Sequence, residues 1–116
     1  MSLVMELTDE TFVKEVVEAG VPVMVDFWAP WCGPCRAVAP TMEEVASEFQ
    51  GRAKVVKVNV DENQGVSGAM NIRSIPTVAV FVGNTVVDMR MGALPKPHYQ
   101  QMLNNALAGQ GTSPTA

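Results

Sequence analysis

The chain has 116 residues, 47% of them hydrophobic and 17% charged, with a formal net charge of −4, which predicts one globular domain with its own core. The acidic balance, without a basic stripe of interleaved aromatic residues, argues against nucleic acid and anionic membranes as partners. No apolar run approaches the roughly 20 residues that a membrane-spanning helix needs.

The first 20 residues predict a short strand followed by a helix. The strand candidate covers residues 4–7, and Thr8 and Asp9 are residue types that cap a helix N-terminus. Within residues 12–17, apolar side chains recur four positions apart, which is the spacing of one helix face. Gly20 stands where a glycine commonly ends a helix.

A buried strand and a longer helix are expected next. Residues 23–29 form a strongly apolar run, which predicts a buried strand, and residues 36–49 have helical periodicity. The apolar stripe of this helix consists of Val38, Met42, Val45 and Phe49. Methionines at helix or strand spacing along the chain are expected to fill the core.

The second half predicts a strand, a weak helix, a hairpin and a final helix. In chain order these cover residues 54–60, 61–70, 77–82 with 85–91, and 95–108, and Gly83-Asn84 supplies the hairpin turn. The element order is therefore βαβαβαββα, an α/β fold. Helices link the first three strands, which favours parallel pairing with right-handed crossovers, whereas the last two strands pair antiparallel. We expect a central mixed five-stranded sheet with helices on both faces, and a disordered polar tail over residues 109–116.

Both cysteines of the chain lie in Trp31-Cys32-Gly33-Pro34-Cys35, directly after the apolar strand. Two thiols at this spacing can close a disulfide, so they form a two-electron switch. A thiol at a helix N-terminus becomes more acidic, because unpaired backbone N–H groups and the helix dipole stabilise the thiolate. The sequence therefore predicts a redox site at the junction of strand and helix.

Residues 28–35, Trp-Ala-Pro-Trp-Cys-Gly-Pro-Cys, together with Asp26, Lys57 and Ile75-Pro76-Thr77, closely resemble the thioredoxin family. The match covers roughly residues 3–108 in element order as well as in motif, so the expected domain is 1–108. A Cys-x-x-Cys pair alone would be weak evidence. The pentapeptide around it, the preceding aspartate and the Ile-Pro-Thr segment make the resemblance specific.

The resemblance implies a thiol-disulfide oxidoreductase that reduces disulfides in protein substrates and is recycled by a thioredoxin reductase. Cys32 would be the nucleophile and Cys35 the resolving thiol, and the redox-active disulfide between them would serve in place of a cofactor. Gly33 and Pro34 would hold the turn, and Pro76, cis in the family, would pack against the disulfide. The oxidising relatives more often carry a histidine between the cysteines, so Gly33-Pro34 favours a reductant.

Asp26 is a carboxyl in an apolar strand, and such a group is costly to bury without a purpose. We interpret Asp26 as a carboxyl with a raised pKa that exchanges a proton with Cys35, the alternative being a structural carboxylate held by hydrogen bonds or by Lys57. Lys57 interrupts a valine-rich strand. It either tunes Asp26 or only extends its ammonium group to solvent.

The resemblance also implies a flat apolar surface around Cys32 that docks protein substrates. Its residues would be Trp31, Val60, Ser74, Ile75, Gly92 and Ala93, next to Gly33 and Pro34. Taken singly, each of these could be ordinary loop chemistry. The backbone of Ile75 would hold an extended substrate segment.

Two other classes of function compete with this reading. The fold could serve as a scaffold subunit in which the thiols are incidental. A zinc site needs about four ligands, and two cysteines with the single histidine, His98, cannot supply them, so no metal is expected. An iron–sulfur cluster shared between two copies would need only two cysteines from each, but it is rare in this fold.

The remaining expectations concern partners and compartment. The N-terminus has neither a basic segment nor an apolar core of a signal peptide, which favours the cytoplasm, although a segment removed earlier would leave no trace. We expect a monomer. For the electron source, an NADPH-linked reductase is favoured over a ferredoxin-linked one.

Overall fold

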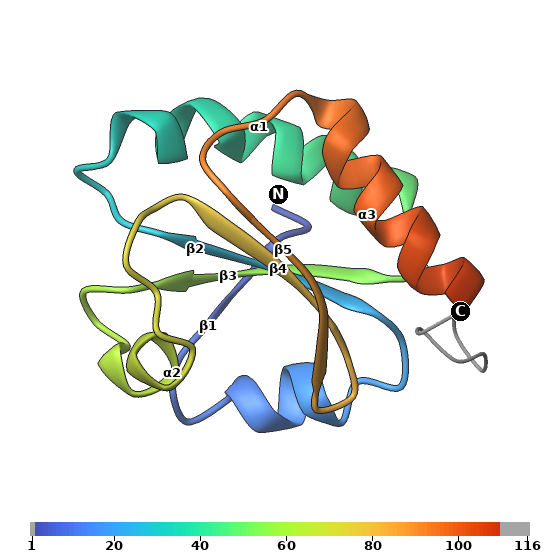
Figure 1. Ribbon diagram of the computed structural model, residues 1–116, viewed down its shortest axis with the longest axis horizontal. Coiled ribbons are helices and arrows are strands. Elements are labelled where there is room, and N and C mark those ends of the chain that lie inside the picture. Colours follow the sequence, from blue (N-terminus) through green and yellow to red (C-terminus); the bar gives the residue numbers. More distant parts are fainter. Residues whose placement is uncertain (1, 110–116) are drawn as a thin grey trace.

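A five-stranded mixed sheet forms the centre of the protein, whose computed structural model describes residues 2–109 (Figure 1). The strands are β1 (Met5–Leu7), β2 (Val23–Trp28), β3 (Lys54–Asn59), β4 (Thr77–Val82) and β5 (Thr85–Met91), in the spatial order β1-β3-β2-β4-β5. β3 pairs parallel with both β1 and β2, whereas β4 pairs antiparallel with β2 and β5. The α/β fold and the mixed sheet expected from the sequence are confirmed.

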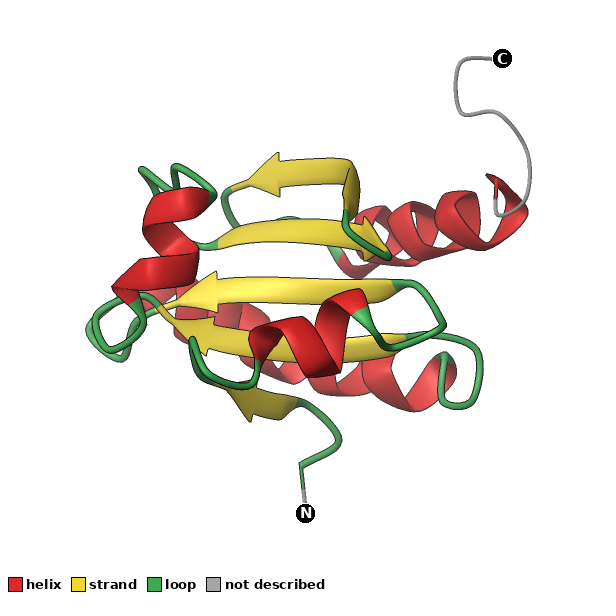
Figure 2. Ribbon diagram, turned by 90° about the horizontal axis from the view of Figure 1, so that it is seen from below, coloured by secondary structure: helices red, strands yellow, loops and turns green. Residues whose placement is uncertain are grey.

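Helices cover both faces of this sheet (Figures 1 and 2). They are η1 (Val13–Val17), α1 (Gly33–Glu48), α2 (Gln64–Ala69) and α3 (Lys96–Gly109). In Figure 1, α1 and α3 lie above the sheet, and η1 and α2 lie below it. Gly109, expected to begin the tail, ends α3, and the rest of the expected tail, 110–116, lies outside the described residues.

The first helix differs from the expectation. It is a single π-helical turn, and neither Thr8 nor Asp9 caps it. Asp9 instead accepts hydrogen bonds from the N–H groups of Gly65 and Val66, at 3.0 and 2.8 Å, in the first turn of α2. An aspartate is favourable at a helix N-terminus wherever it comes from in the sequence, and here it links the loop after β1 to α2.

α1 begins three residues earlier than the expected start at Arg36. Cys32 is its N-cap residue, and Pro34 lies in the first turn, where a missing N–H leaves no helical bond unmade. The expected apolar stripe of α1 is buried, with exposed fractions of 3% or less. α1 therefore starts at the redox motif itself, which fixes the position of both cysteines.

Alternation along the strands divides the core into two layers. Val25 and Phe27 of β2 pack under η1 and α2 with Val58 and Phe81, whereas Met24 packs under α1 and α3. The expectation that methionines fill the core is confirmed for Met24, Met42 and Met102, which are at most 2% exposed. It is wrong for Met5, Met89 and Met91, because β1 and β5 are the edge strands of the sheet.

Candidate functional site

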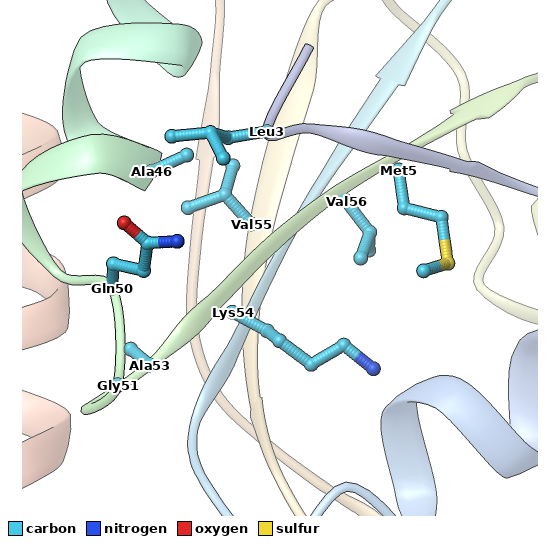
Figure 3. Close-up of a pocket in the computed structure, with 9 residues that line it drawn as sticks. All are labelled: Leu3, Met5, Ala46, Gln50, Gly51, Ala53, Lys54, Val55 and Val56. Atoms are coloured by element: carbon cyan, nitrogen blue, oxygen red, sulfur yellow. The ribbon is translucent and has the colours of Figure 1, made fainter. Parts of the chain in front are cut away.

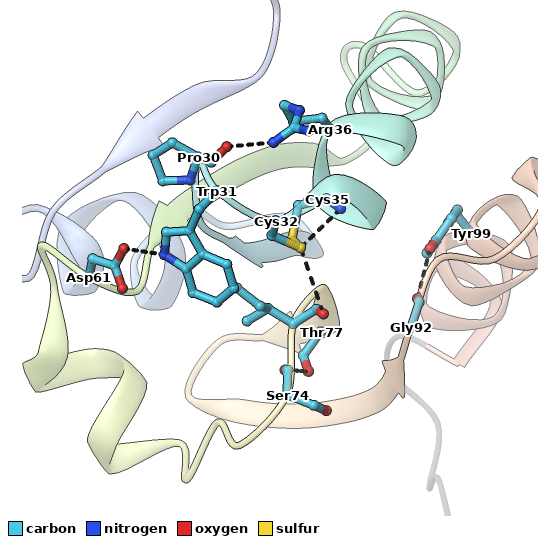
Figure 4. Close-up of a disulfide and its surroundings, with 11 residues drawn as sticks. Pro30, Trp31, Cys32, Cys35, Arg36, Asp61, Ser74, Thr77, Gly92 and Tyr99 are labelled. Atoms are coloured by element: carbon cyan, nitrogen blue, oxygen red, sulfur yellow. Dashed lines mark hydrogen bonds between the residues drawn. A yellow bond between two sulfur atoms is a disulfide. The ribbon is translucent and has the colours of Figure 1, made fainter.

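Cys32 and Cys35 form a disulfide where β2 passes into α1 (Figure 4). Their Cα atoms are 5.2 Å apart, and the backbone N–H of Cys35 points to Cys32 Sγ at an N···S distance of 3.1 Å. Cys32 is 5% exposed and Cys35 2%, so the first sulfur is the more accessible one. After reduction, a thiolate on Cys32 would face the free N–H groups of the 16-residue helix α1, which stabilise negative charge.

The loop before β4 lies against the disulfide. The peptide bond between Ile75 and Pro76 is cis, as predicted, and the carbonyl oxygen of Ile75 lies 3.8 Å from Cys32 Sγ. Thr77 holds this loop because its hydroxyl donates to the carbonyl oxygen of Ser74 at 2.6 Å. A backbone carbonyl beside Cys32 Sγ is suited to pair with the backbone of an extended segment.

Trp31 projects from the turn before Cys32 and is 68% exposed. Its indole N–H donates to Asp61 Oδ2 at 2.7 Å (Figure 4). The backbone N–H of Asp61 in turn donates to Asn59 Oδ1 at 2.9 Å. Sequence reasoning missed Asp61. A signal existed, because Asp61 follows β3 and parallel strands bring their carboxyl ends to one edge of the sheet.

Tyr99 positions the loop after β5 and was also missed. Its hydroxyl accepts from the N–H of Leu94 at 2.9 Å and donates to the carbonyl oxygen of Gly92 at 3.4 Å. Gly92 adopts φ 88°, a conformation that favours glycine, and its N–H donates to the carbonyl oxygen of Pro76 at 2.8 Å. The loop with Gly92 and Ala93 is thereby tied to the cis-proline loop.

Asp26 lies on β2 beneath α1 and α3 and is 3% exposed. Its Oδ1 atom is buried without a hydrogen-bond partner among residues 2–109. Burial raises the pKa of Asp26 from 3.8 to about 7, and the charge of Lys57 acts in the opposite direction. A carboxyl with such a pKa is poised to gain and lose a proton near neutral pH.

Lys57 is the neighbour of Asp26 in the register between β2 and β3. Its ammonium nitrogen lies 4.9 Å from the centroid of the Trp28 ring, a cation–π arrangement. Trp28 packs in turn against the small cluster of Ala29, Cys32 and Cys35. Lys57 thus acts on Asp26 through its charge, while its head group rests on the aromatic ring beside the disulfide.

The residues expected to dock substrates surround the cysteines. Trp31, Ser74 and Ala93 are exposed, and Val60, Ile75 and Gly92 are half-buried. Val60 and Ile75 pack against the cluster that contains both cysteines. Together with Gly33 and Pro34, which are exposed, these residues form what we call the docking surface.

The comparisons agree with this geometry. Residues 3–105 match the family model described as Thioredoxin. The chain belongs to the thioredoxin family. It is 53% identical to Thioredoxin 1 of Nostoc sp. over 107 residues, 92% of this chain and 100% of that protein. It is 44% identical to Thioredoxin of Haemophilus influenzae, over 90% of this chain and 97% of that protein.

Another thioredoxin relative has an organellar name. The chain is 46% identical to Thioredoxin M-type, chloroplastic, of Chlamydomonas reinhardtii, over 87% of this chain and 72% of that protein. Family membership, with a cysteine pair that closes a disulfide, makes the chain a protein-disulfide oxidoreductase. The resemblance seen in the sequence and the expected enzyme class are confirmed.

Away from the thioredoxin-type redox site, a shallow groove of about 220 Å³ lies at the other end of β3 (Figure 3). Leu3, Met5, Ala46, Gln50, Gly51, Ala53, Lys54, Val55 and Val56 line it. Lys54 is its only charged residue, and its ammonium group is bound to Glu15 at 2.7 Å. The groove holds no group suited to redox or acid–base chemistry.

No helix within residues 2–109 is long and apolar enough to cross a membrane. That part of the chain also has no group of three or more histidine, cysteine, aspartate or glutamate side chains arranged to hold a metal ion. Arg36, which follows Cys35, is exposed, and its guanidinium group donates to the carbonyl oxygen of Pro30 at 2.8 Å.

Proposed function

We propose that the protein reduces disulfides in other proteins and is then recycled by a thioredoxin reductase. The observation that carries this proposal is the disulfide at the start of α1, with Cys32 at the edge of the docking surface. Within the described residues, no other thiol and no charged side chain is hydrogen-bonded to Cys32 or Cys35. The site therefore contains two thiols, a helix N-terminus and an apolar surface.

The reaction proceeds in two exchanges. The thiolate of Cys32 attacks one sulfur of the substrate disulfide, forms a mixed disulfide and releases the other substrate sulfur as a thiolate. Cys35 then attacks Cys32 Sγ, which forms the bond between Cys32 and Cys35 and releases the second substrate sulfur. Two electrons pass to the substrate, which leaves as a dithiol.

Asp26 serves the second exchange in this proposal. Cys35 is 2% exposed and must lose a proton before it can attack, and few groups could receive that proton inside the protein. Asp26 is buried on the sheet face that α1 covers, has one oxygen without a hydrogen-bond partner among residues 2–109, and has a pKa of about 7. Lys57 would keep that pKa from rising further, so that a useful fraction of Asp26 is ionised at neutral pH.

The direction of electron flow and the compartment follow from the residues between the cysteines. Gly33-Pro34 supplies no cation to stabilise the Cys32 thiolate, which favours a reductant over an oxidant. A reductant suits the cytoplasm, where thiols are kept reduced. We propose an NADPH-linked reductase as the electron source and a monomer as the working form.

The test combines a potential with a trapping experiment. The equilibrium potential of the cysteine pair, followed by tryptophan emission in defined thiol buffers, should lie below that of the glutathione pool. Cys35→Ser should form a stable mixed disulfide with a protein substrate, because the resolving thiol is missing. A potential above that of glutathione, or a variant that traps nothing, would refute the proposal.

The role of Asp26 has its own test. In single-turnover reactions at neutral pH, Asp26→Asn should slow the resolving exchange by roughly a hundredfold, the lower end of the usual contribution of a general base. The first attack by Cys32 should keep its rate, which serves as the internal control. If both exchanges kept their rates, Asp26 would be a structural carboxyl only.

A further inference from the structure

Met91 stands out among the exposed apolar residues because of its position. Trp31 and Met91 are the most exposed large apolar side chains of residues 2–109, at 68% each. Met91 ends β5, opposite Thr77 in the register with β4. The next residue, Gly92, donates its N–H to the carbonyl oxygen of Pro76. Met91 therefore borders the docking surface, one residue from the loop that faces the disulfide.

Met91 is also the most accessible sulfur among the described residues. Met24, Met42 and Met102 are at most 2% exposed, Met89 is 40% exposed and Met5 49%. Both cysteine sulfurs are buried and already bonded to each other in the oxidised form. Among the sulfurs of residues 2–109, a small oxidant that meets the oxidised protein thus finds Met91 first, since oxidation of methionine follows exposure.

We propose that Met91 is a site of reversible oxidation that weakens substrate docking without altering the cysteine pair. A hydroperoxide such as hydrogen peroxide transfers one oxygen atom to the Met91 thioether. The sulfur loses two electrons and becomes a sulfoxide, the O–O bond breaks, and the peroxide leaves as water. Methionine sulfoxide reductases reverse this change, which makes it suitable for regulation.

The consequence for docking rests on the proposed function. A thioether is apolar and flexible and fits varied partner surfaces, whereas a sulfoxide is polar and accepts hydrogen bonds. Placing a sulfoxide against an apolar partner without a donor costs binding free energy. Because oxidation of Met91 leaves both cysteines and the disulfide between them chemically unchanged, the exchange chemistry itself should be unchanged.

Met89 is the matched control for Met91. Both side chains project from the same face of β5, because they are two residues apart and oppose Ala79 and Thr77 of β4. Met89 lies farther along the strand from Gly92 and is less exposed. Arg90 stands between the two methionines, so trypsin places them on different peptides and their oxidation can be measured separately.

The experiment exposes the oxidised full-length protein to hydrogen peroxide, removes the peroxide with catalase and maps the oxygen added to each tryptic peptide. Fragmentation of the peptide that begins at Met91 separates this residue from buried Met102. Met91 should be oxidised first. The treated protein should then reduce insulin roughly fivefold more slowly, with dithiothreitol as electron donor, while its reaction with a small aromatic disulfide keeps its rate.

Two variants make the result decisive, each compared with its own untreated sample. Treated Met89→Leu should lose activity as the wild type does, whereas treated Met91→Leu should lose none. The inference is overturned if Met91 is not oxidised before Met102, if treated Met91→Leu loses as much activity as the wild type, or if insulin reduction is unchanged once Met91 is a sulfoxide. Failure of the untreated protein to reduce insulin would instead refute the proposed function, and the peptide map would still report on Met91.

Discussion

The two faces of the sheet are built from alternate residues of the same strand and differ in one respect. β2 directs Val25 and Phe27 to the face under η1 and α2, where they join a cluster of aliphatic and aromatic side chains. It directs Met24 to the face under α1 and α3, which is equally well packed. Asp26, two residues after Met24, lies on the same face as Met24, and it is the one buried carboxyl among residues 2–109.

This difference sets apolar side chains that stabilise the core against a carboxyl that destabilises it when charged. Apolar side chains on either face gain free energy when they leave water. A carboxyl without a partner for one of its oxygens does the opposite, because its charged form loses solvation. The face that carries α1, and with it both cysteines, therefore tolerates a buried carboxyl that the other face lacks, and a buried carboxyl with a raised pKa is the kind of group that clusters at functional sites.

The largest effect should come from the face that has no buried carboxyl among residues 2–109. Phe27 is fully buried, so Phe27→Ala should lower the free energy of unfolding by about 3–5 kcal/mol. The loss should be the same at pH 5 and pH 8, because Phe27 packs among apolar side chains. Urea denaturation of the oxidised protein, followed by circular dichroism at both pH values, measures it. A loss that depended on pH would remove the contrast between the two faces.

Removing the carboxyl on the other face should raise the free energy of unfolding instead of lowering it. The folded-state pKa of Asp26 is raised from 3.8 to about 7, so its stabilising contribution is complete below pH 3.8 and is lost as the pH rises through 7. The difference between the two pKa values corresponds to roughly 4 kcal/mol. Asp26→Asn should thus leave stability nearly unchanged at pH 4 and raise it by up to that amount at pH 9.

The same two denaturation series give the control for Asp26. Phe27→Ala is measured together with Asp26→Asn from pH 4 to pH 9, because its free energy of unfolding should differ from that of the wild type by the same amount at every pH. An Asp26→Asn effect of equal size at pH 4 and pH 9 would show that the carboxyl does not titrate between these values. The raised pKa and the contrast between the faces would then both be wrong.

Much of the fold could be predicted because its signals are local. The hairpin strands over 77–82 and 85–91 match the sequence expectation residue for residue, since the turn at Gly83-Asn84 and the β-branched runs define them. The first helix lies within the predicted segment, but the absence of its predicted cap could not be foreseen, because Asp9 finds its partners 56 and 57 residues away, in α2. Capping residues in a sequence do not say which helix they cap.

The candidate site divides in the same way. Cys32, Cys35 and Pro76 could be located because each lies in a short motif beside a recognisable strand. Tyr99 could not, because its hydrogen bonds to Gly92 and Leu94 depend on how the loop after β5 folds back onto α3. Asp61 could be placed at the correct edge of the sheet, but its bond to Trp31 depends on the orientation of the indole N–H. The exposure of Met5, Met89 and Met91 could not be predicted, because periodicity indicates on which face of a strand a side chain lies but not whether the strand is at the edge of the sheet.

A smaller effect is expected at the contact that replaces the predicted helix cap. Asp9→Ala should lower the free energy of unfolding by about 1–2 kcal/mol, because two backbone N–H groups of α2 lose their acceptor. Glu10→Ala, at the exposed neighbouring position, is the control and should change stability little.

Gly65 offers an independent check of the Asp9 contact. A methyl group at Gly65 would come within 2.9 Å of Asp9 Oδ2, so Gly65→Ala should displace the carboxylate. In an unobstructed helix this substitution would stabilise by about 1 kcal/mol. Here it should give no gain or a loss, and a full gain would show that Asp9 does not hold α2.

The smallest effect concerns a charge on the same face of the sheet as Asp26. Lys57 lies beside Asp26 in the sheet, and its positive charge lowers the pKa of that carboxyl against the larger effect of burial. Lys57→Met should therefore raise the pKa of Asp26 above about 7 and leave less of it ionised at neutral pH. If Asp26 accepts the proton of Cys35, the resolving exchange at pH 7 should slow by roughly two- to fivefold. Its pH profile should also move to higher pH.

Lys54→Met is the matched control for Lys57→Met. It removes the same charge from the same strand, but Lys54 is paired with Glu15 at 2.7 Å and lowers the pKa of that carboxyl instead. The control should leave the pH profile of the resolving exchange in place. Equal shifts in both variants would mean that Asp26 responds to the net charge of the protein. A shift in Lys57→Met alone would mean that the ammonium group resting on Trp28 sets the protonation of the buried carboxyl.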